Sequence, residues 1–361
     1  MLLALAGLGL GFVMGATARA GRFCTFGAVE DFVLARKTLR LKAWALAIAV
    51  AVICVQIMHH FGIARIDEVF YLAPRIGLAS SIGGGLLFGL GMSMVGTCGY
   101  GVIVRMAGGD LKALFSFLVL GLAGYMTARG LTSFIKVYTL DSIAFDVGSI
   151  GGQGLPHFVG WLTGIAPAHL WLPIGLAVGG AMIVYCFKDP VFRRSRRDVV
   201  AGILIGLAVA GGFFATGYIG ADPFDEVRVQ SLTYVLPLGE TLIWLMTFTG
   251  ASITFAIAVV AGTFFGALAI VVIRDEIRWE GFDDMQEMRR HLLGAAAMGA
   301  GGVTALGCTI GQGISGVSTL AISPLFTLAS IFLGATFGLH WLLTGSAREA
   351  GRIMFTNEYS G

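Results

Sequence analysis

The chain has 361 residues, of which 57% are hydrophobic and 12% are charged, and its formal net charge is +3. Soluble domains carry about 25% charged residues, so this composition excludes an ordinary soluble protein and indicates an all-α, polytopic membrane protein. Because the Lys and Arg residues are dispersed between apolar stretches, the small positive charge does not indicate a nucleic-acid-binding surface.

Nine apolar stretches are long enough to cross about 30 Å of hydrocarbon. In chain order, we predict transmembrane helices at approximately 2–18, 43–61, 78–96, 111–128, 158–186, 199–217, 250–273, 291–306 and 321–342. The longest holds Pro167 and Pro173, which predict a short helix followed by the span proper. The stretch 231–249, with Glu240 at its middle, is either a tenth element or a partly buried helix. No basic segment precedes the first stretch, so we predict a retained helix rather than a secretory signal.

Basic residues predict the orientation of these helices through the positive-inside rule. They cluster at 36–42, 188–197, 274–290 and 348–352, and an even number of predicted spans separates each cluster from the next. The loops on the other side of the membrane are acidic or mixed. We therefore predict a periplasmic N-terminus and a cytoplasmic C-terminus.

An internal repeat explains part of the high glycine content, 54 residues. When the chain is aligned with itself at an offset of 210 residues, six glycine or cysteine positions coincide. They are Gly84, Gly89, Gly91, Cys98, Gly101 and Gly124, which match Gly294, Gly299, Gly301, Cys308, Gly311 and Gly334. At an offset of 74, they are Gly11, Gly15, Cys24 and Gly27 with Gly85, Gly89, Cys98 and Gly101. We predict a fourth copy around Gly217. Odd numbers of spans separate the matching units, so matching units have opposite orientations in the membrane. We therefore predict that the halves 1–190 and 191–361 are inverted repeats within one membrane domain, a pattern typical of transporters.

Helix interruptions are expected where the repeat is richest in glycine. Segments 96–101 and 307–313 each hold three glycines around a cysteine, and each glycine costs about 1 kcal/mol relative to alanine inside a helix. We predict four such loops meeting at the membrane midplane, where the freed N–H groups must bond to protein or to something in a cavity. Close helix packing is the alternative role for glycine, and we assign it to Gly84 and Gly91.

The cysteines divide into two groups. All five together include no C-x-x-C pair and are odd in number, so they predict neither a disulfide framework nor a thiolate zinc site. Cys54 and Cys186 lie outside the repeat and are expected to be apolar filler. Cys24, Cys98 and Cys308 share one repeat position and are predicted functional. If an anion passes them, neutral thiols are the better state, because an S–H group donates to an anion whereas a thiolate repels it.

Other substrate-binding candidates lie in or beside the same loops: Gly99, Gly101, Gly311, Gln312 and Arg22. Arg22 and Arg105 either supply a positive field or extend to the cytoplasmic surface. Gln312 and Ser315 are further candidate donors to the substrate. For Gln312, a hydrogen bond to the backbone that ties the loop in place is the alternative. The six histidines show no ligand spacing, so we predict no metal site and no cofactor.

The loops Arg22–Ala28, Gly96–Gly101 and Gly307–Gly313 resemble those of the YeeE/YedE family of sulfur transport proteins, and the likeness covers nearly the whole chain. The resemblance implies a bacterial inner-membrane protein of about nine spans, with four loops buried at the waist of an hourglass. It implies thiosulfate uptake along a relay of three cysteine thiols, here Cys24, Cys98 and Cys308. It also implies a separate TusA-like cytoplasmic sulfur carrier as partner.

Two other classes of function remain open from the sequence. The same cysteines could support a membrane thiol oxidoreductase, although quinone and haem ligand patterns are missing. The chain could also be a non-transporting sensor or scaffold for a sulfur carrier. Within transport, the motifs do not choose among thiosulfate, sulfite, sulfide and a selenium analogue.

Overall fold

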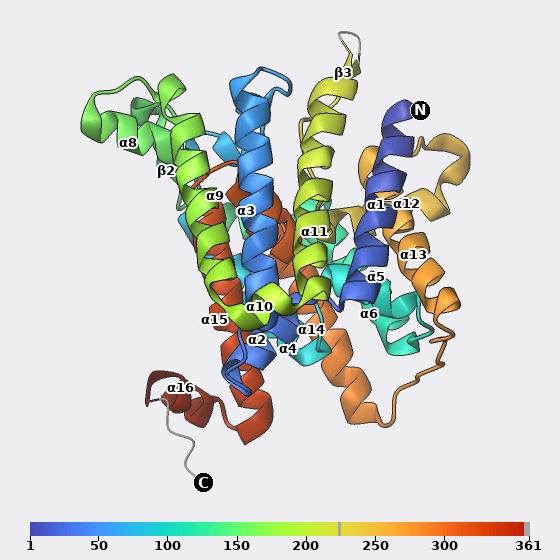
Figure 1. Cartoon of the computed structure of the whole chain (residues 1–361). Coiled ribbons are helices and arrows are strands. Elements are labelled where there is room, and N and C mark those ends of the chain that lie inside the picture. The colour runs from blue at the N-terminus through green and yellow to red at the C-terminus, as the bar shows by residue number, and fades with distance from the viewer. Residues whose placement is uncertain (223–224, 357–361) are drawn as a thin grey trace.

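The structure is a computed structural model that describes residues 1–222 and 225–356, and it is a bundle of helices with two very short sheets (Figure 1). Within these residues, eight helical segments are long and apolar enough to cross a membrane. They are Leu2–Val33, Leu39–His60, Leu78–Met106, Leu111–Arg129, Pro167–Lys188, Arg196–Ile219, Phe255–Ile273 and Ser323–Thr344. The chain is therefore a multi-pass membrane protein, as its composition predicts.

The first half of the bundle begins at the N-terminus and ends at the α9–α10 turn. Its elements are α1 (Leu2–Gly21), α2 (Thr25–Val33), α3 (Leu39–His60), η1 (Ile66–Glu68), η2 (Phe70–Leu72), β1 (Arg75–Ile76), α4 (Leu78–Val95), α5 (Gly99–Met106), α6 (Leu111–Arg129), α7 (Leu131–Ile135), η3 (Lys136–Leu140), β2 (Phe145–Asp146), η4 (Gly148–Ile150), α8 (Leu155–Thr163), η5 (Pro167–His169) and α9 (Trp171–Lys188). As predicted, the stretch 158–186 is a short helix, α8, followed by the spanning helix α9.

The second half continues from the short helix α10. Its elements are α10 (Pro190–Arg194), α11 (Arg196–Phe214), η6 (Ala215–Ile219), β3 (Ala221–Asp222), β4 (Asp225–Glu226), α12 (Val235–Met246), η7 (Phe248–Gly250), α13 (Phe255–Ile273), α14 (Met285–Thr304), η8 (Gly311–Gly316), α15 (Ser323–Thr344) and α16 (Ala347–Thr356). The borderline stretch 231–249 contains α12, whose 12 residues are too few to cross a bilayer.

The ninth predicted span, 291–306, differs from the other eight. It belongs to α14, which has 20 residues but begins before the predicted start and carries Glu287, Arg289, Arg290 and His291 in its first two turns. These polar turns keep α14 outside the set of helices that are apolar along a full membrane thickness. α14 packs against α4 and α6 inside the bundle, and its apolar part begins only after these polar turns.

The two ends of the bundle differ in charge. Figure 1 places the N-terminus, β3 and α8 at the upper end and α10 and α16 at the lower end. Only five of the 24 Lys and Arg residues belong to upper-end segments, namely Arg65, Arg75, Arg129, Lys136 and Arg228. The basic clusters of the sequence therefore gather at one end of the folded molecule.

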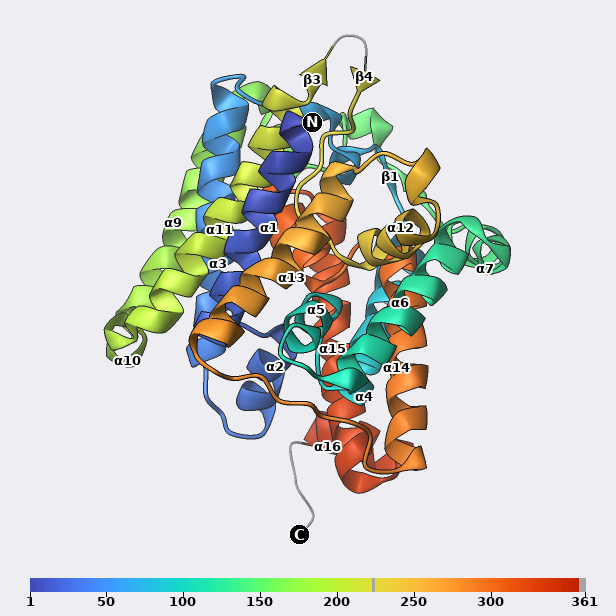
Figure 2. The same ribbon diagram turned by 90° about the vertical axis from the view of Figure 1, so that its right-hand side faces the viewer.

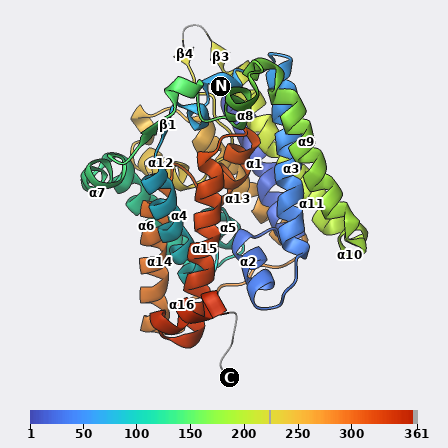
Figure 3. The same cartoon turned by 90° about the vertical axis from the view of Figure 1, so that its left-hand side faces the viewer.

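Glycines bring the backbones of several helix pairs into direct contact. A Cβ atom on Gly11 or Gly15 of α1 would collide with backbone atoms of α13, beside which α1 lies in Figure 2. Gly85 and Gly89 of α4, also four residues apart, meet the backbone of α15 in the same way (Figure 3). Small residues permit such close approach in membranes, where dispersion and backbone contact replace the hydrophobic effect between helices.

Gly84 and Gly91 show the packing role that the sequence predicts for them. Both face α14, where a Cβ atom on Gly84 would lie 2.6 Å from Ala305 N, and one on Gly91 would meet the carbonyl oxygen of Gly294. The bundle is thus held by glycine seams that are separate from the cysteine loops.

We predict that Gly15→Leu destabilises the protein by about 2 kcal/mol or more, because the side chain must push α1 away from α13. The matched control is Gly9→Leu on the same helix, since no atom lies within 4 Å of a Cβ atom placed there. Thermal unfolding in detergent should show a lower Tm for Gly15→Leu alone. Equal melting of the two variants would contradict the close-packed α1–α13 seam.

Candidate substrate passage

Three helices are interrupted at a cysteine with the same backbone geometry. The residue two positions before each cysteine adopts the left-handed conformation: Arg22 at φ 53°, Gly96 at φ 74° and Leu306 at φ 58°. Cys24 and Cys98 are then the N-cap residues of α2 and α5, and Cys308 stands directly before the helical residues that lead into η8. Only glycine adopts this conformation without strain, so tertiary contacts hold Arg22 and Leu306 in place.

Two of the thiols cap the helix that they begin. Cys24 Sγ accepts a hydrogen bond from Gly27 N, and Cys308 Sγ accepts one from Gly311 N, both at 3.4 Å. A cap of this kind satisfies one of the N–H groups left free at a helix start. Cys98 makes no such cap, and its thiol instead donates to Thr25 Oγ1 over 3.9 Å.

The three cysteine loops meet in the interior of the bundle. Thr25 follows Cys24, Thr309 follows Cys308, and the Thr25 hydroxyl donates to Thr309 Oγ1 at 3.3 Å. Cys98, Thr25 and Thr309 are each at most 1% exposed, Cys308 is buried and Cys24 is partly exposed. Loops that are far apart in the sequence therefore form one polar centre.

The prediction of an interruption at Gly217 is wrong. Gly217 lies in the π-helical segment η6, which continues α11 without a break. The chain instead leaves the helix after Ile219 and reaches α12 through a non-helical segment at 227–234. There Leu232 O accepts a hydrogen bond from Ser315 Oγ at 2.9 Å, and the Tyr234 ring packs on Tyr100. Gly217 thus stays within the helix, and residues 232–234 contact the other loops instead.

A large cavity of about 900 Å³ lies toward the upper end of the bundle. It is lined by the α3–α4 connection, by segment 227–230 and by the Cys308 loop at Leu306, Gly307 and Gln312. Among its basic side chains, Arg65 pairs with Glu68 and Lys136 with Asp141. Its lining also includes Arg75 and Arg228, so basic side chains outnumber the acidic Glu68 and Asp141 and the cavity carries a net positive charge.

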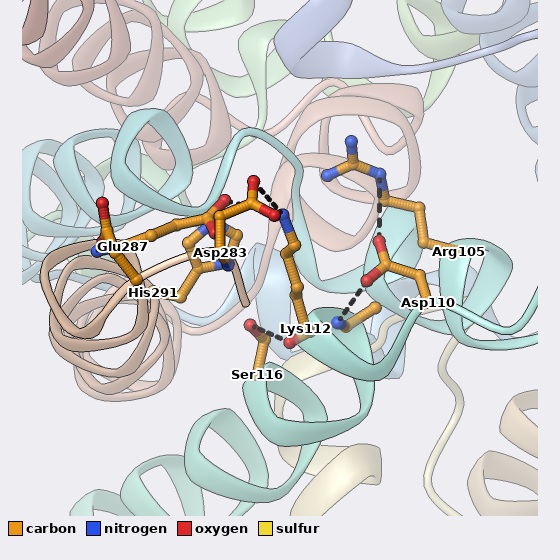
Figure 4. A network of polar contacts seen from close by, with 9 residues as sticks. Arg105, Asp110, Lys112, Ser116, Asp283, Glu287 and His291 are labelled. Atoms are coloured by element: carbon orange, nitrogen blue, oxygen red, sulfur yellow. Dashed lines mark hydrogen bonds and ion pairs between the residues drawn. The ribbon is translucent and has the colours of Figure 1, made fainter. Parts of the chain in front are cut away.

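A second cavity of about 250 Å³ lies toward the lower end. It is lined by Val95 and Gly96 beside the Cys98 loop and by a network of charged side chains drawn in Figure 4. In that network Lys112 Nζ contacts Glu287 Oε1 at 2.8 Å, while Arg105 Nε lies 3.8 Å from Asp110 Oδ2. The cysteine loops therefore lie between a cavity toward the upper end and a cavity toward the lower end.

The structure places the predicted glycines and Gln312 in the cysteine loops and the two arginine side chains outside the loop centre. Gly99, Gly101 and Gly311 lie in the first turns after Cys98 and Cys308, and all the glycines three residues after a cysteine face a polar side chain. Gln312 ties the loop to α14, since Nε2 donates to Ala305 O at 2.7 Å. Arg22 is exposed, and Arg105 lines the lower cavity rather than the loop centre.

Two side chains that brace the loops carry no signal in the sequence pattern. The buried Tyr71 hydroxyl donates to Gly311 O at 2.6 Å, and burial raises the pKa of Tyr71 above its usual value, so it acts as a neutral donor. The Arg40 guanidinium lies against Gly27 in the first turn of α2, with its Nε 3.2 Å from Asp31 Oδ2. Neither residue is near a repeat motif in the sequence, and folding alone brings them to the cysteine loops.

A helical membrane bundle whose centre is built from broken helices, between two oppositely facing cavities, has the construction of a membrane transport protein. Comparison with known sequences specifies the class. A family model described as Sulphur transport matches residues 20–337, so the chain belongs to this family, the YeeE/YedE family that its loops resemble. Membership assigns the chain a role in membrane transport of sulfur compounds.

Two relatives carry the same description of activity. The chain is 26% identical to "Thiosulfate transporter TsuA" of Spirochaeta thermophila over 352 residues, which cover 93% of this chain and 98% of the relative. It is 24% identical to "Thiosulfate transporter TsuA" of Escherichia coli over 362 residues, with 97% of each chain covered. The likeness therefore extends over the full membrane domain.

We predict that Tyr71→Phe lowers the free energy of unfolding by about 1–3 kcal/mol, because it leaves the buried Gly311 carbonyl without its donor. Tyr138→Phe is the control, since Tyr138 is 76% exposed. Thermal unfolding of both variants checks this expectation. An unchanged Tm for Tyr71→Phe would show that the tie to the Cys308 loop contributes nothing to stability.

Proposed function

We propose that this protein takes up thiosulfate or a closely related sulfur-containing anion through the three cysteine loops. The observation that carries the proposal is the convergence of the loops of Cys24, Cys98 and Cys308 between an upper and a lower cavity. The substrate class is supported by the two relatives named as thiosulfate transporters. The proposed order of passage is upper cavity, Cys308, Cys98, Cys24 and lower end.

The loops replace hydrogen bonds that an anion loses when it leaves water. Burying an unpaired charge is costly in an apolar interior, whereas each hydrogen bond to a charged group contributes about 1.5–3 kcal/mol. Neutral thiols donate without carrying charge of their own, and the N-terminal turns of α2 and α5 add N–H groups and the positive end of the helix dipole. Donors of this kind bind an anion weakly enough to release it to the next site.

The orientation of transport follows from the basic lower end. Lys and Arg residues gather there, and cytoplasmic loops carry such an excess, so we place the upper cavity in the periplasm and α16 in the cytoplasm. A TusA-like sulfur carrier would meet the anion at the lower end. The halves 1–190 and 191–361 are proposed as inverted repeats, supported by the matching geometry at Cys24, Cys98 and Cys308.

We predict that Cys98→Ala and Cys308→Ala each reduce uptake of labelled thiosulfate into proteoliposomes by at least about tenfold, because each removes a donor from the passage. Cys54→Ala is the control, since Cys54 lies within the uninterrupted helix α3, and this variant should transport normally. Normal uptake by both loop variants would refute the relay.

The same vesicles distinguish the alternatives. Labelled thiosulfate, sulfite, sulfate and selenite, tested in parallel, identify the preferred anion. Trapping a Cys98–Cys308 disulfide during turnover would instead favour a thiol oxidoreductase. Binding of a sulfur carrier without flux of any of the four anions would favour a scaffold.

A further inference from the structure

Two buried threonines at the meeting point of the loops have hydroxyls that serve no local structural purpose. Elsewhere in the bundle, the hydroxyls of Thr127, Thr263 and Thr304 donate to the carbonyl four residues earlier in their own helix, as threonine commonly does. Thr25 and Thr309 instead bond to one another across 284 residues of sequence. Their helices are started by the thiols of the preceding cysteines, so neither hydroxyl is needed as a cap.

These two hydroxyls and the Cys98 thiol form a chain of hydrogen bonds. The thiol donates to Thr25 Oγ1 at 3.9 Å, and Thr25 donates to Thr309 Oγ1 at 3.3 Å. Thr25 therefore accepts one hydrogen bond and donates another, and the three buried polar groups pair with one another.

The three hydrogen-bonded groups line neither of the two cavities. Gly307 and Gln312 of the Cys308 loop line the upper cavity, and Val95 and Gly96 beside Cys98 line the lower one. Two oxygens at hydrogen-bond distance leave no room for an ion between them. For an anion to pass between Thr25 and Thr309, the two hydroxyls must separate, and changes of side-chain rotamer provide a way to do so.

We propose that the hydroxyls of Thr25 and Thr309 and the thiol of Cys98 form a three-donor binding site for an anion with a terminal XO₃ group, closed at rest by their mutual hydrogen bonds. An anion presents only acceptors, so all three protons turn from one another toward it. Three terminal oxygens match three donors. The groups carry no fixed charge, which keeps binding weak enough for release. The proposal rests on the proposed function and names the site at its centre.

Paired substitutions separate the hydroxyl from the shape of the side chain. Thr25→Val and Thr309→Val keep the volume and remove the donor, whereas Thr25→Ser and Thr309→Ser keep the donor and remove a methyl group. We expect the valine variants to lower thiosulfate uptake into proteoliposomes by about tenfold or more, since each loses one hydrogen bond to a charged ligand. The serine variants should stay within about threefold of the unchanged protein. The reverse order, with serine impaired and valine normal, would show that the threonines only fill space and would overturn the proposal.

Alkylation of Cys98 provides a readout that does not depend on flux. Thiosulfate should slow the reaction of Cys98 with a membrane-permeable maleimide in the unchanged protein, and this protection should be lost in Thr25→Val and Thr309→Val that retain the Tm of the unchanged protein. Undiminished protection in both valine variants would overturn the three-donor site.

The proposed function and the three-donor site fail in different ways. If the unchanged protein transports sulfite or selenite instead of thiosulfate, the substrate assignment fails, and the same Ser and Val comparison tests the site with that anion. If no anion of the panel is transported and none protects Cys98 in the unchanged protein, both proposals are overturned. Protection without transport would support the site and contradict the transport function.

Discussion

The requirement that every backbone N–H and C=O be satisfied away from water governs this fold. A helix that breaks inside a membrane exposes such groups, and only protein contacts or a polar cavity can receive them. Here the breaks at Cys24, Cys98 and Cys308 are enclosed by other helices, two thiols cap the restarting helices, and Tyr71 and Gln312 take up further groups of the Cys308 loop and of α14. The polar centre exists because contacts with the surrounding bundle offset the free-energy cost of interrupting the helices.

Glycine serves two separate purposes in this structure. Along α1, α4 and α14 it allows backbones to touch, as at Gly15 against α13 and Gly91 against α14. In the loops it allows a left-handed residue at Gly96 and leaves space for polar side chains, as where Gly311 faces Thr233. The packing glycines let the helices lie in direct contact, and the loop glycines leave space for polar side chains. Glycine is therefore abundant in a chain that is both tightly packed and interrupted.

The distribution of charge separates two functions in the same way. Most Lys and Arg residues gather at the lower end, while Arg75 and Arg228 line the upper cavity and the buried centre holds hydroxyls and thiols. Charged groups thus attract an anion at the mouth of the proposed passage, and neutral donors receive it in the interior. A fixed positive charge at the centre would hold the anion rather than pass it on.

Composition and spacing determined the class of fold, eight of the spans and the three cysteines at which helices break, because hydrophobic length and glycine content act locally along the chain. They could not determine what contacts the loops. The charged start of α14 lowers its apolar signal, and residues 232–234, rather than Gly217, contact the other loops. Thr25 and Thr309 each follow a repeat cysteine, but their hydrogen bond to one another has no signal in the sequence, and Tyr71 and Arg40 follow no repeat. They reach the cysteines only when helices distant in the chain pack together, so tertiary structure alone decided which side chains complete the site.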